Sequence, residues 1–521
     1  MPIRMVKEPG NNKPRRSRKS SSRNTSMRGG RGGMAGGLGN LVAVVLPYLI
    51  KRPKLLIGLI IVVVIGYFAF KSCSPDANVV NSLFKTGGEF NKEFYESTEI
   101  YEPLADNVKN PLPEQVSLEK YAPKRLNQGR QGSCVAWASA YAARTILEAK
   151  RTGEDPNSVR YSPSFMYNQI SIDHNTCQGS YIKLAMDNMM EKGAVPFNDF
   201  RYDDSDCNRQ PSSELIASAS INKIKGFQRL TDDNQSRVHE MISIKQNLAK
   251  GSPVIIGMMV GGSFMQNMKG KDVWIPTNSD YSQRGFGGHA MCVIGYDDYK
   301  EGGSFQIMNS WGEEWGNKGI AWVRYTDFKE FNVESYGLYP MGDASAVKVN
   351  SFEGSFGLEL NEGKKTIGLN RVNDIYFETI GVVSSSDKFK VEFTNNVECY
   401  TYLFGEESDG SSYVLFPYTK KHSPYCGITG TRLFPRDYSM QPDDQGQKDK
   451  IAVLVTKKPI DYDIINAQIS SSKGSTYESK VKSALKSVYA SNVKFSGNQI
   501  VNFTTSMSED NGVVFVIGIN K

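Results

Sequence analysis

The chain has 521 residues, enough for two or three domains, and its 39% hydrophobic and 11% aromatic content is ordinary for globular protein. Its net charge of +7 is unevenly distributed, because residues 1–54 carry 13 lysines and arginines against a single acid, Glu8. This basic tail has a charge of +12 and leaves −5 for residues 55–521, so nucleic acid is not expected as a partner. The "RGGRGG" run at 28–33 has no aromatic residues and is typical of a disordered segment.

An apolar run of 16 residues, 55–70, follows the tail and is flanked by Lys54 and Lys71. As a helix rising about 1.5 Å per residue it covers roughly 24 Å, and snorkelling lysines extend its reach toward the ~30 Å core of a bilayer. The positive charge before the run predicts a single transmembrane helix with residues 1–54 in the cytoplasm. Residues 71–521 would then be periplasmic or extracellular.

Other interpretations of this region are weaker. A signal peptide would need a much shorter charged start and a small-residue cleavage site. The shorter apolar run 41–50 contains Pro47, and paired with 55–70 as a hairpin it would leave the rest of the chain in the cytoplasm. Cys73 is a poor lipoprotein acceptor because the charged Lys71 stands where a small residue is needed.

Residues 71–115 are expected to form a stalk, since charges and prolines interrupt any periodic element. The next part, 116–345, shows helical periodicity at 134–150 and 181–193, followed by short β-like runs between glycines. Helices before strands indicate an α+β fold and not an alternating β/α sheet.

The last part, 346–521, predicts a mostly antiparallel β domain with one helix at 477–490. Its alternating runs lie at 388–394, 400–404, 412–417, 450–456 and 512–519.

Seven cysteines in 521 residues do not make a disulfide scaffold, although an exported chain permits bridges. Cys177 with Cys207, and Cys399 with Cys426, are the pairs whose spacing encloses local loops. The sequence alone leaves the connectivity open. Cys292 is expected to pack in a strand as a small hydrophobe.

Cys134 lies in "NQGRQGSCVAWA", where the helical pattern begins. A cysteine attacks as its thiolate, and both the first turn of a helix and a nearby imidazole favour that form. Of four histidines, His289 follows two glycines and begins an apolar strand, whereas His174, His239 and His422 are expected to be surface or loop residues. Asn309, 20 residues after His289, could fix the tautomer of its ring.

Cys134, His289 and Asn309, in this order, resemble the catalytic residues of the papain family of cysteine peptidases, in its bacterial form. The segments "QGSC" and "NSWGEEWGNKG" resemble the family's sequence around its nucleophile and its asparagine. The resemblance covers about 116–345 and implies a papain-like fold with a helical lobe and a β-barrel-like lobe. It also implies peptide-bond hydrolysis without cofactor or metal.

The same resemblance assigns further roles. Gln128 matches the oxyanion-hole glutamine, and Trp311 shields the bond between the histidine and the asparagine. The resemblance also assigns substrate-binding roles to Gly179, Ser180, Gly288 and Trp311.

The chain departs from the family's pattern at several positions. Ser180 stands where the family has a second glycine, so its side chain is expected to narrow the groove. Gln131 replaces a disulfide cysteine, which leaves Cys177 to pair with Cys207. Val135 stands where plant and animal members usually carry tryptophan. No helical propeptide is evident in 71–115, so zymogen control is not expected.

The sequence therefore predicts a membrane-anchored cysteine peptidase acting on protein or peptide substrates. A papain-fold scaffold with a blocked groove is the alternative, and an acyl transferase is a third possibility. The C-terminal part resembles a bacterial β domain of unknown function, which implies binding or scaffolding and a protein partner. The "DDSD" run at 203–206 is expected to be a solvated turn and not a calcium site.

Overall fold

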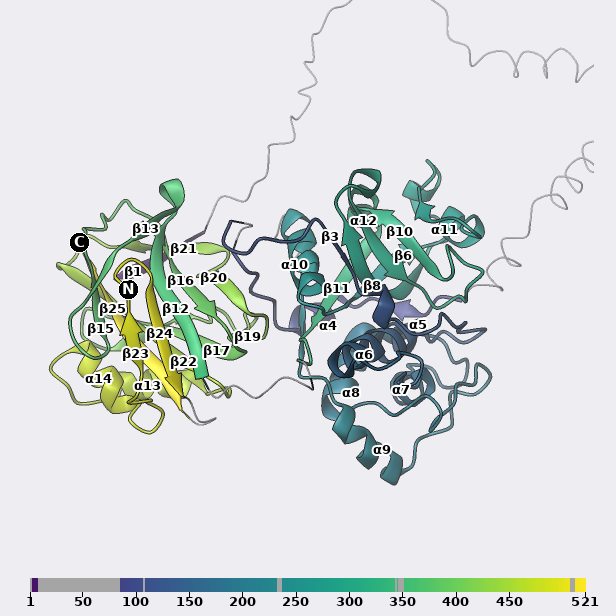
Figure 1. Ribbon diagram of the computed structural model, residues 1–521, viewed down its shortest axis with the longest axis horizontal. Coiled ribbons are helices and arrows are strands. Elements are labelled where there is room, and N and C mark those ends of the chain that lie inside the picture. Colours follow the sequence, from purple (N-terminus) through teal and green to yellow (C-terminus); the bar gives the residue numbers. More distant parts are fainter. Residues whose placement is uncertain are drawn as a thin grey trace, which may run out of the picture. The chain divides into compact units, whose positions relative to one another are not determined.

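A computed structural model describes residues 2–7, 85–105, 108–231, 237–342, 344, 351–506 and 511–521 (Figure 1). The elements form two sets: helices and then strands between residues 88 and 338, and a mainly β set made of residues 351–520 together with β1 near the start of the chain. The expected membrane segment, 55–70, lies outside the described residues. Within those ranges, no helix has the length and apolar character needed to cross a bilayer.

The helical half of the first set is built around the helix that Cys134 begins. α5 (Cys134–Ala136) continues through a π-helical stretch, Trp137–Arg144, into α6 (Thr145–Thr152). The helix ends at Gly153, whose left-handed φ of 76° suits a residue without a Cβ. Residues 131–149 are buried all round, as expected of a helix enclosed by other elements. The neighbouring helices are α7 (Pro163–Ile170), α8 (Ile182–Glu191) and α9 (Ser213–Ala219).

The strand half of the first set is one sheet with the order β5-β11-β6-β8-β9-β10-β7, and β3 pairs with β8. Its strands are β3 (Gln115–Ser117), β5 (Phe227–Arg229), β6 (Val254–Val260), β7 (Val273–Trp274), β8 (Gly287–Asp297), β9 (Ser304–Met308), β10 (Ile320–Arg324) and β11 (Asn332–Leu338). Its helices are α10 (Arg237–Ala249), α11 (Gly262–Gln266) and α12 (Tyr325–Phe331). β8 and β9 are antiparallel, with Cys292 opposite Met308. The start of β8 and the end of β9 therefore meet at one edge, which brings His289 beside Asn309.

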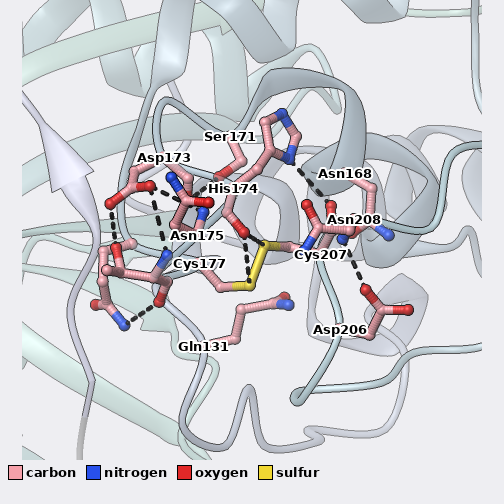
Figure 2. Close-up of a disulfide and its surroundings, with 12 residues drawn as sticks. Gln131, Asn168, Ser171, Asp173, His174, Asn175, Cys177, Asp206, Cys207 and Asn208 are labelled. Atoms are coloured by element: carbon pink, nitrogen blue, oxygen red, sulfur yellow. Dashed lines mark hydrogen bonds between the residues drawn. A yellow bond between two sulfur atoms is a disulfide. The ribbon is translucent and has the colours of Figure 1, made fainter.

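A disulfide joins Cys177 and Cys207 in the helical half, with Cα atoms 5.7 Å apart (Figure 2). This confirms the pairing expected once Gln131 replaced the family's usual cysteine. His174, expected to be a surface or loop residue, is half-buried beside the bridge, where its Nδ1 lies 3.1 Å from the carbonyl oxygen of Cys207 (Figure 2). The carbonyl of Cys177 accepts a hydrogen bond from the backbone N–H of Gly132 at 2.9 Å. The disulfide loop is thus tied to the segment just before Cys134.

The second set consists of two sheets and two helices. The first sheet contains β1 (Ile3–Lys7), β12 (Ser351–Leu360), β13 (Lys365–Ile367), β16 (Phe389–Asn395), β20 (Gly430–Phe434), β21 (Tyr438–Pro442), β23 (Lys494–Ser496) and β24 (Val501–Ser506). The second contains β14 (Leu369–Arg371), β15 (Tyr376–Thr379), β17 (Cys399–Glu406), β18 (Ser412–Phe416), β19 (Tyr425–Cys426), β22 (Lys448–Thr456) and β25 (Gly512–Asn520). The helices are α13 (Tyr462–Ser471) and α14 (Tyr477–Ala484).

Strand alternation explains why this set has two cores. Along β22, Val453 packs into the cluster shared by both sheets, whereas Leu454 packs into a second cluster with residues of α13 and α14. Phe356 of the first sheet stacks on Phe515 of the second, with ring centroids 3.6 Å apart. The second sheet is therefore buried on both faces, and α13, which the sequence did not predict, covers part of it with α14.

Residues 3–7 differ from the expectation of a disordered tail. They form β1, which pairs antiparallel with β21, and Ile3 is buried in the core between the sheets. The hydroxyl of Tyr413 contacts both the N–H and the carbonyl of Ile3, at 3.1 and 3.3 Å. A single membrane crossing at 55–70 would separate this strand from the domain it pairs with. β1 therefore argues against the expected single-pass topology.

Replacing Ile3 with alanine tests whether β1 contributes to the domain. Removing a buried isoleucine side chain typically costs about 2–5 kcal/mol, so we expect faster amide hydrogen exchange in β21 and β1. Lys7→Ala, at an exposed position of the same strand, should leave exchange unchanged. All five tryptophans lie in the first set, so their fluorescence should not respond to either change. Unaltered exchange in β21 of the Ile3→Ala variant would show that β1 does not dock.

Candidate active site

Cys134 is the first residue of α5 and is completely buried. Its Sγ accepts a hydrogen bond from the backbone N–H of Ala290 at 3.4 Å. Ala290 directly follows His289 in β8, so the fold brings the cysteine to the histidine across 155 residues of chain. The Cys134 sulfur therefore contacts the backbone next to His289, in agreement with the predicted proximity of the two residues.

His289 and Asn309 form the pair that the sequence predicted. The Nε2 of His289 lies 2.8 Å from the Oδ1 of Asn309, and the His289 ring stacks on Trp311 with centroids 4.3 Å apart. Asn309 Oδ1 also accepts the N–H of Ser310 at 2.7 Å, which identifies it as an acceptor. Nε2 of His289 therefore carries the proton. Its Nδ1 is buried without a hydrogen-bond partner and is left free to accept one.

Gln128 is held in place beside this pair. Its Oε1 accepts the Ser310 hydroxyl at 2.6 Å, and its backbone N–H donates to the Ser310 carbonyl at 2.8 Å. Its Nε2 donates to the carbonyl of Gln131 at 3.0 Å, which leaves a second amide hydrogen. Both ends of the Gln128 side chain are thus fixed by hydrogen bonds to Gln131 and Ser310.

The sequence did not reveal that residues 202–204 brace this loop. The Tyr202 hydroxyl donates to the Gln128 carbonyl at 2.7 Å and accepts a hydrogen bond from the hydroxyl of Ser133 at 2.6 Å. Asp204 accepts the backbone N–H of Arg130 at 3.0 Å. The "DDSD" run, expected to be a solvated turn, therefore also positions the Gln128 loop. Only the tertiary contact carries this signal, because 74 residues separate Tyr202 from Gln128.

A second unpredicted feature is the segment Lys85–Phe90, here called the strap, which was expected to belong to a stalk. Its β2 (Gly88–Glu89) pairs in parallel with β4 (Ser180–Tyr181). A Cβ on Gly87 would lie 2.2 Å from the carbonyl oxygen of Gly132, and Gly87 has a φ of 156°. A Cβ on Gly88 would lie 3.1 Å from the backbone N of His289. The "GG" pair is what lets the strap pass between the two halves.

The strap contacts every residue to which the resemblance assigned substrate binding. Its backbone exchanges hydrogen bonds with Ser180 N–H at 2.9 Å and with the carbonyl of Gly288 at 3.2 Å, both through Gly87. The carbonyl of Lys85 accepts the indole N–H of Trp311 at 2.9 Å. A Cβ built on Gly179 would lie 3.1 Å from the side chain of Glu89. The predicted groove is therefore occupied by this chain's own backbone.

Ser180 does not narrow the groove in the way its sequence position implied. Its hydroxyl donates to the carbonyl of Ile170 at 2.9 Å, within the helical half, and only its backbone faces the strap. The strap instead ends on a hollow in the sheet. A Cβ on Gly257 would lie 2.4 Å from the ring of Phe90, and one on Gly288 would lie 3.1 Å from it. Two glycines thus make room for a benzyl side chain.

Beyond the strap, the chain enters α4 (Lys92–Ser97), which is fastened to β11. The Tyr95 hydroxyl donates to the carbonyl of Ser335 at 3.1 Å, and Asn91 caps the helix through the N–H of Phe94 at 3.0 Å. The Tyr95 ring packs edge-on against Tyr336, with centroids 5.1 Å apart. The strap is therefore anchored at its C-terminal end by a buried aromatic contact.

Burial under the strap changes the protonation of the catalytic pair. Burial raises the pKa of the Cys134 thiol to about 12, although the N–H of Ala290 favours the thiolate. Burial likewise lowers the pKa of His289 to about 4, against the smaller effect of its hydrogen bond to Asn309. The sequence led us to expect a thiolate–imidazolium pair. Burial therefore favours the neutral form of both groups.

Comparison with protein families agrees with this geometry. The model of the family described as papain family cysteine protease matches residues 112–341. These residues form a papain-family cysteine protease domain. This domain has the papain-like fold, with mixed helix and sheet content.

Individual proteins resemble the protease domain at modest identity. An uncharacterised peptidase C1-like protein of Acanthamoeba polyphaga mimivirus is 28% identical over 216 residues, covering 40% of this chain and 67% of the viral protein. Cathepsin K of Mus musculus is 28% identical over 214 residues, and the match spans 59% of its length. The solved structure of xylellain, a cysteine protease from Xylella fastidiosa, superposes with a TM-score of 0.41 at 24% identity. The superposed region covers 50% of this chain and 96% of xylellain.

Gly87→Ala is expected to displace the strap from the protease domain, because the new Cβ meets the carbonyl of Gly132. We expect alkylation of Cys134 by iodoacetamide to accelerate by about tenfold or more, since the thiol gains access and water. Gly381→Ala is the matched control, because a Cβ there meets nothing within 4 Å. Equal alkylation rates in the two variants would contradict the occupied groove.

The pH dependence of the same reaction provides a second test. With the strap in place, the raised pKa of Cys134 keeps the thiolate scarce at neutral pH, so its alkylation rate should still be rising above about pH 9. In Gly87→Ala the solvated thiol should have a lower pKa, and the rising part of the profile should move toward neutral pH. Superimposable profiles would mean that the strap does not control the ionisation of Cys134.

Proposed function

We propose that this protein is a latent cysteine peptidase, which hydrolyses peptide bonds in protein or peptide substrates when the strap leaves the groove. The proposal rests on the way in which the strap is bound. Gly87 and Lys85 are bound through their backbone atoms, next to Cys134 and His289. A groove that binds an extended peptide by its main chain beside a cysteine and an imidazole is suited to peptide-bond cleavage.

In the proposed reaction each step is assigned to one of the residues described above. Nδ1 of His289 takes the thiol proton of Cys134 as Sγ attacks the scissile carbonyl carbon. The oxyanion that forms accepts hydrogen bonds from the backbone N–H of Cys134 and the free amide hydrogen of Gln128. The imidazolium then protonates the leaving amine, and the new amino terminus departs.

His289 next removes a proton from a water molecule, which attacks the acyl-enzyme and releases the carboxylate and the thiol. Asn309 holds the ring in one tautomer throughout, and Trp311 covers the bond between them. The hollow over Gly257, filled here by Phe90, would receive a bulky apolar side chain of the substrate. The disulfide between Cys177 and Cys207 supports an oxidising compartment for the protease domain.

One alternative function has direct support. A groove occupied by the strap is also what a catalytically blocked papain-fold binding protein would need. The two proposals differ in what happens after the strap is displaced, because only a peptidase then gains hydrolytic activity. The unpartnered Nδ1 of His289 and the oriented Gln128 favour the peptidase, since a scaffold has no need of either.

Hydrolysis of labelled casein by Gly87→Ala protein tests the peptidase directly. We expect activity in this background, none after adding Cys134→Ala, and a loss of about 10²–10³ in kcat after adding Gln128→Ala. The Gln128 change should affect KM little, because the amide acts on the oxyanion. Rapid alkylation of Cys134 without any casein hydrolysis would exclude the peptidase and favour the scaffold.

A further inference from the structure

Two further cysteines face each other in the C-terminal domain, away from the protease site. Cys399 of β17 and Cys426 of β19 are directly opposite in an antiparallel pair. Residues so paired have Cα atoms about 4.5–5.5 Å apart, inside the roughly 4.4–6.8 Å that a disulfide spans. Both side chains are buried and both are free thiols. The pairing of the two strands therefore suits a disulfide between Cys399 and Cys426, but no disulfide joins them.

A buried guanidinium lies beside the thiols. Arg432 is 1% exposed, and its three donor nitrogens bond neutral oxygens: the backbone carbonyls of Glu102 and Ile428 and the side-chain oxygen of Asn395. No carboxylate is among these bonds, although a buried cation needs a nearby negative charge. The carboxylate of Glu102 is itself held by the Nδ1 of His422 at 2.6 Å. His422, expected to be a surface or loop residue, is buried in this cluster.

The two thiols differ in how readily they ionise. Burial opposes ionisation of Cys426, but the hydrogen bond from Cys399 and the charge of Arg432 outweigh it and lower the pKa of Cys426. The hydroxyl of Thr401, 3.6 Å from the Cys426 sulfur, adds another donor. Burial raises the pKa of Cys399 well above its ordinary value, and the neighbouring Cys426 raises it further. Cys426 is thus the nucleophile of the pair and Cys399 the protonated partner.

We propose that Cys399, Cys426 and Arg432 form a redox-active dithiol site that undergoes thiol–disulfide exchange with small disulfides of the glutathione type. The Cys426 thiolate attacks one sulfur of the disulfide and forms a mixed disulfide, and the other half leaves as a thiolate. The Cys399 thiol then loses its proton to solvent and attacks the Cys426 sulfur. The second half leaves, and Cys399 and Cys426 remain joined. Two protein thiols are oxidised while one disulfide is reduced to two thiols.

Access to the site is limited by β19, which consists of Tyr425 and Cys426 alone and pairs only with β17. Opening this short strand exposes the Cys426 sulfur without disturbing the central strands of either sheet. The site lies in a different domain from Cys134, so the proposal does not depend on peptidase activity.

The test follows the thiols of the full-length chain in a Cys134→Ala background, so that the protease thiol is not counted. The protein is equilibrated with oxidised and reduced glutathione near pH 7.5, quenched in acid, and mapped by peptide mass spectrometry. We expect a bond between Cys399 and Cys426, recognised by the loss of two hydrogens. Cys292, which is buried without a thiol partner, is the internal control and should stay unmodified.

Single substitutions separate the two roles. With Cys399→Ser, glutathione should remain attached to Cys426, whereas with Cys426→Ser the thiol at 399 should react about tenfold more slowly or not at all. Arg432→Met should slow the reaction of Cys426 by a similar factor, and Arg432→Lys should restore much of it. If Arg432→Met does not fold by circular dichroism, the two cysteine variants decide. Unmodified thiols throughout, or equal reaction of the two single thiols, would overturn the proposal.

Discussion

The close passage of a glycine pair between the two halves of the protease domain is the contact on which the rest of the site depends. A Cβ on Gly87 would lie 2.2 Å from the carbonyl oxygen of Gly132, and one on Gly288 would lie 1.9 Å from the carbonyl oxygen of Gly88. Because the strap is held by main-chain hydrogen bonds, it takes the place that a peptide would occupy. One backbone contact therefore determines both which groove exists and why it is closed.

Burial also affects the electrostatics of Cys134 and His289. A thiolate and an imidazolium stabilise each other only when the pair is not fully withdrawn from water, because burial penalises both charges. With Cys134 and His289 both buried, the neutral forms are favoured. The hydrogen bond from His289 to Asn309 survives this change, since it needs no charge. The hydrogen bond between His289 and Asn309 is thus in place, but burial disfavours the charged forms of Cys134 and His289.

In the C-terminal domain, the pKa of a buried cysteine is shifted in the opposite direction. Around Cys426, a cation and two hydrogen-bond donors outweigh the loss of water, so the same environment that silences Cys134 favours a thiolate. The hydrogen bond from Cys399 and then the charge of Arg432 lower the pKa of Cys426. A buried sulfur is therefore inert or reactive according to the fixed charges that face it, and not according to burial alone.

Much of the protease site could be predicted from the sequence, because its signals are local. The "QGSC" segment and the helical pattern after it located Cys134, and the strand patterns around His289 and Asn309 singled out these two residues as its partners. The disulfide between Cys177 and Cys207 was expected because Gln131 stands where the family has the usual partner of Cys177.

The tertiary structure alone decided the strap, the bracing of Gln128 by Tyr202, the pairing of β1 with β21, and the charge beside Cys426. Each of these depends on atoms far apart in the chain and on short segments without periodicity, such as "KTGGEF". The sequence by itself determined which reactive groups this protein carries and in what order. Whether those groups are covered, charged or neutral was decided only by folding, since solvent access and fixed charge are properties of the packed molecule.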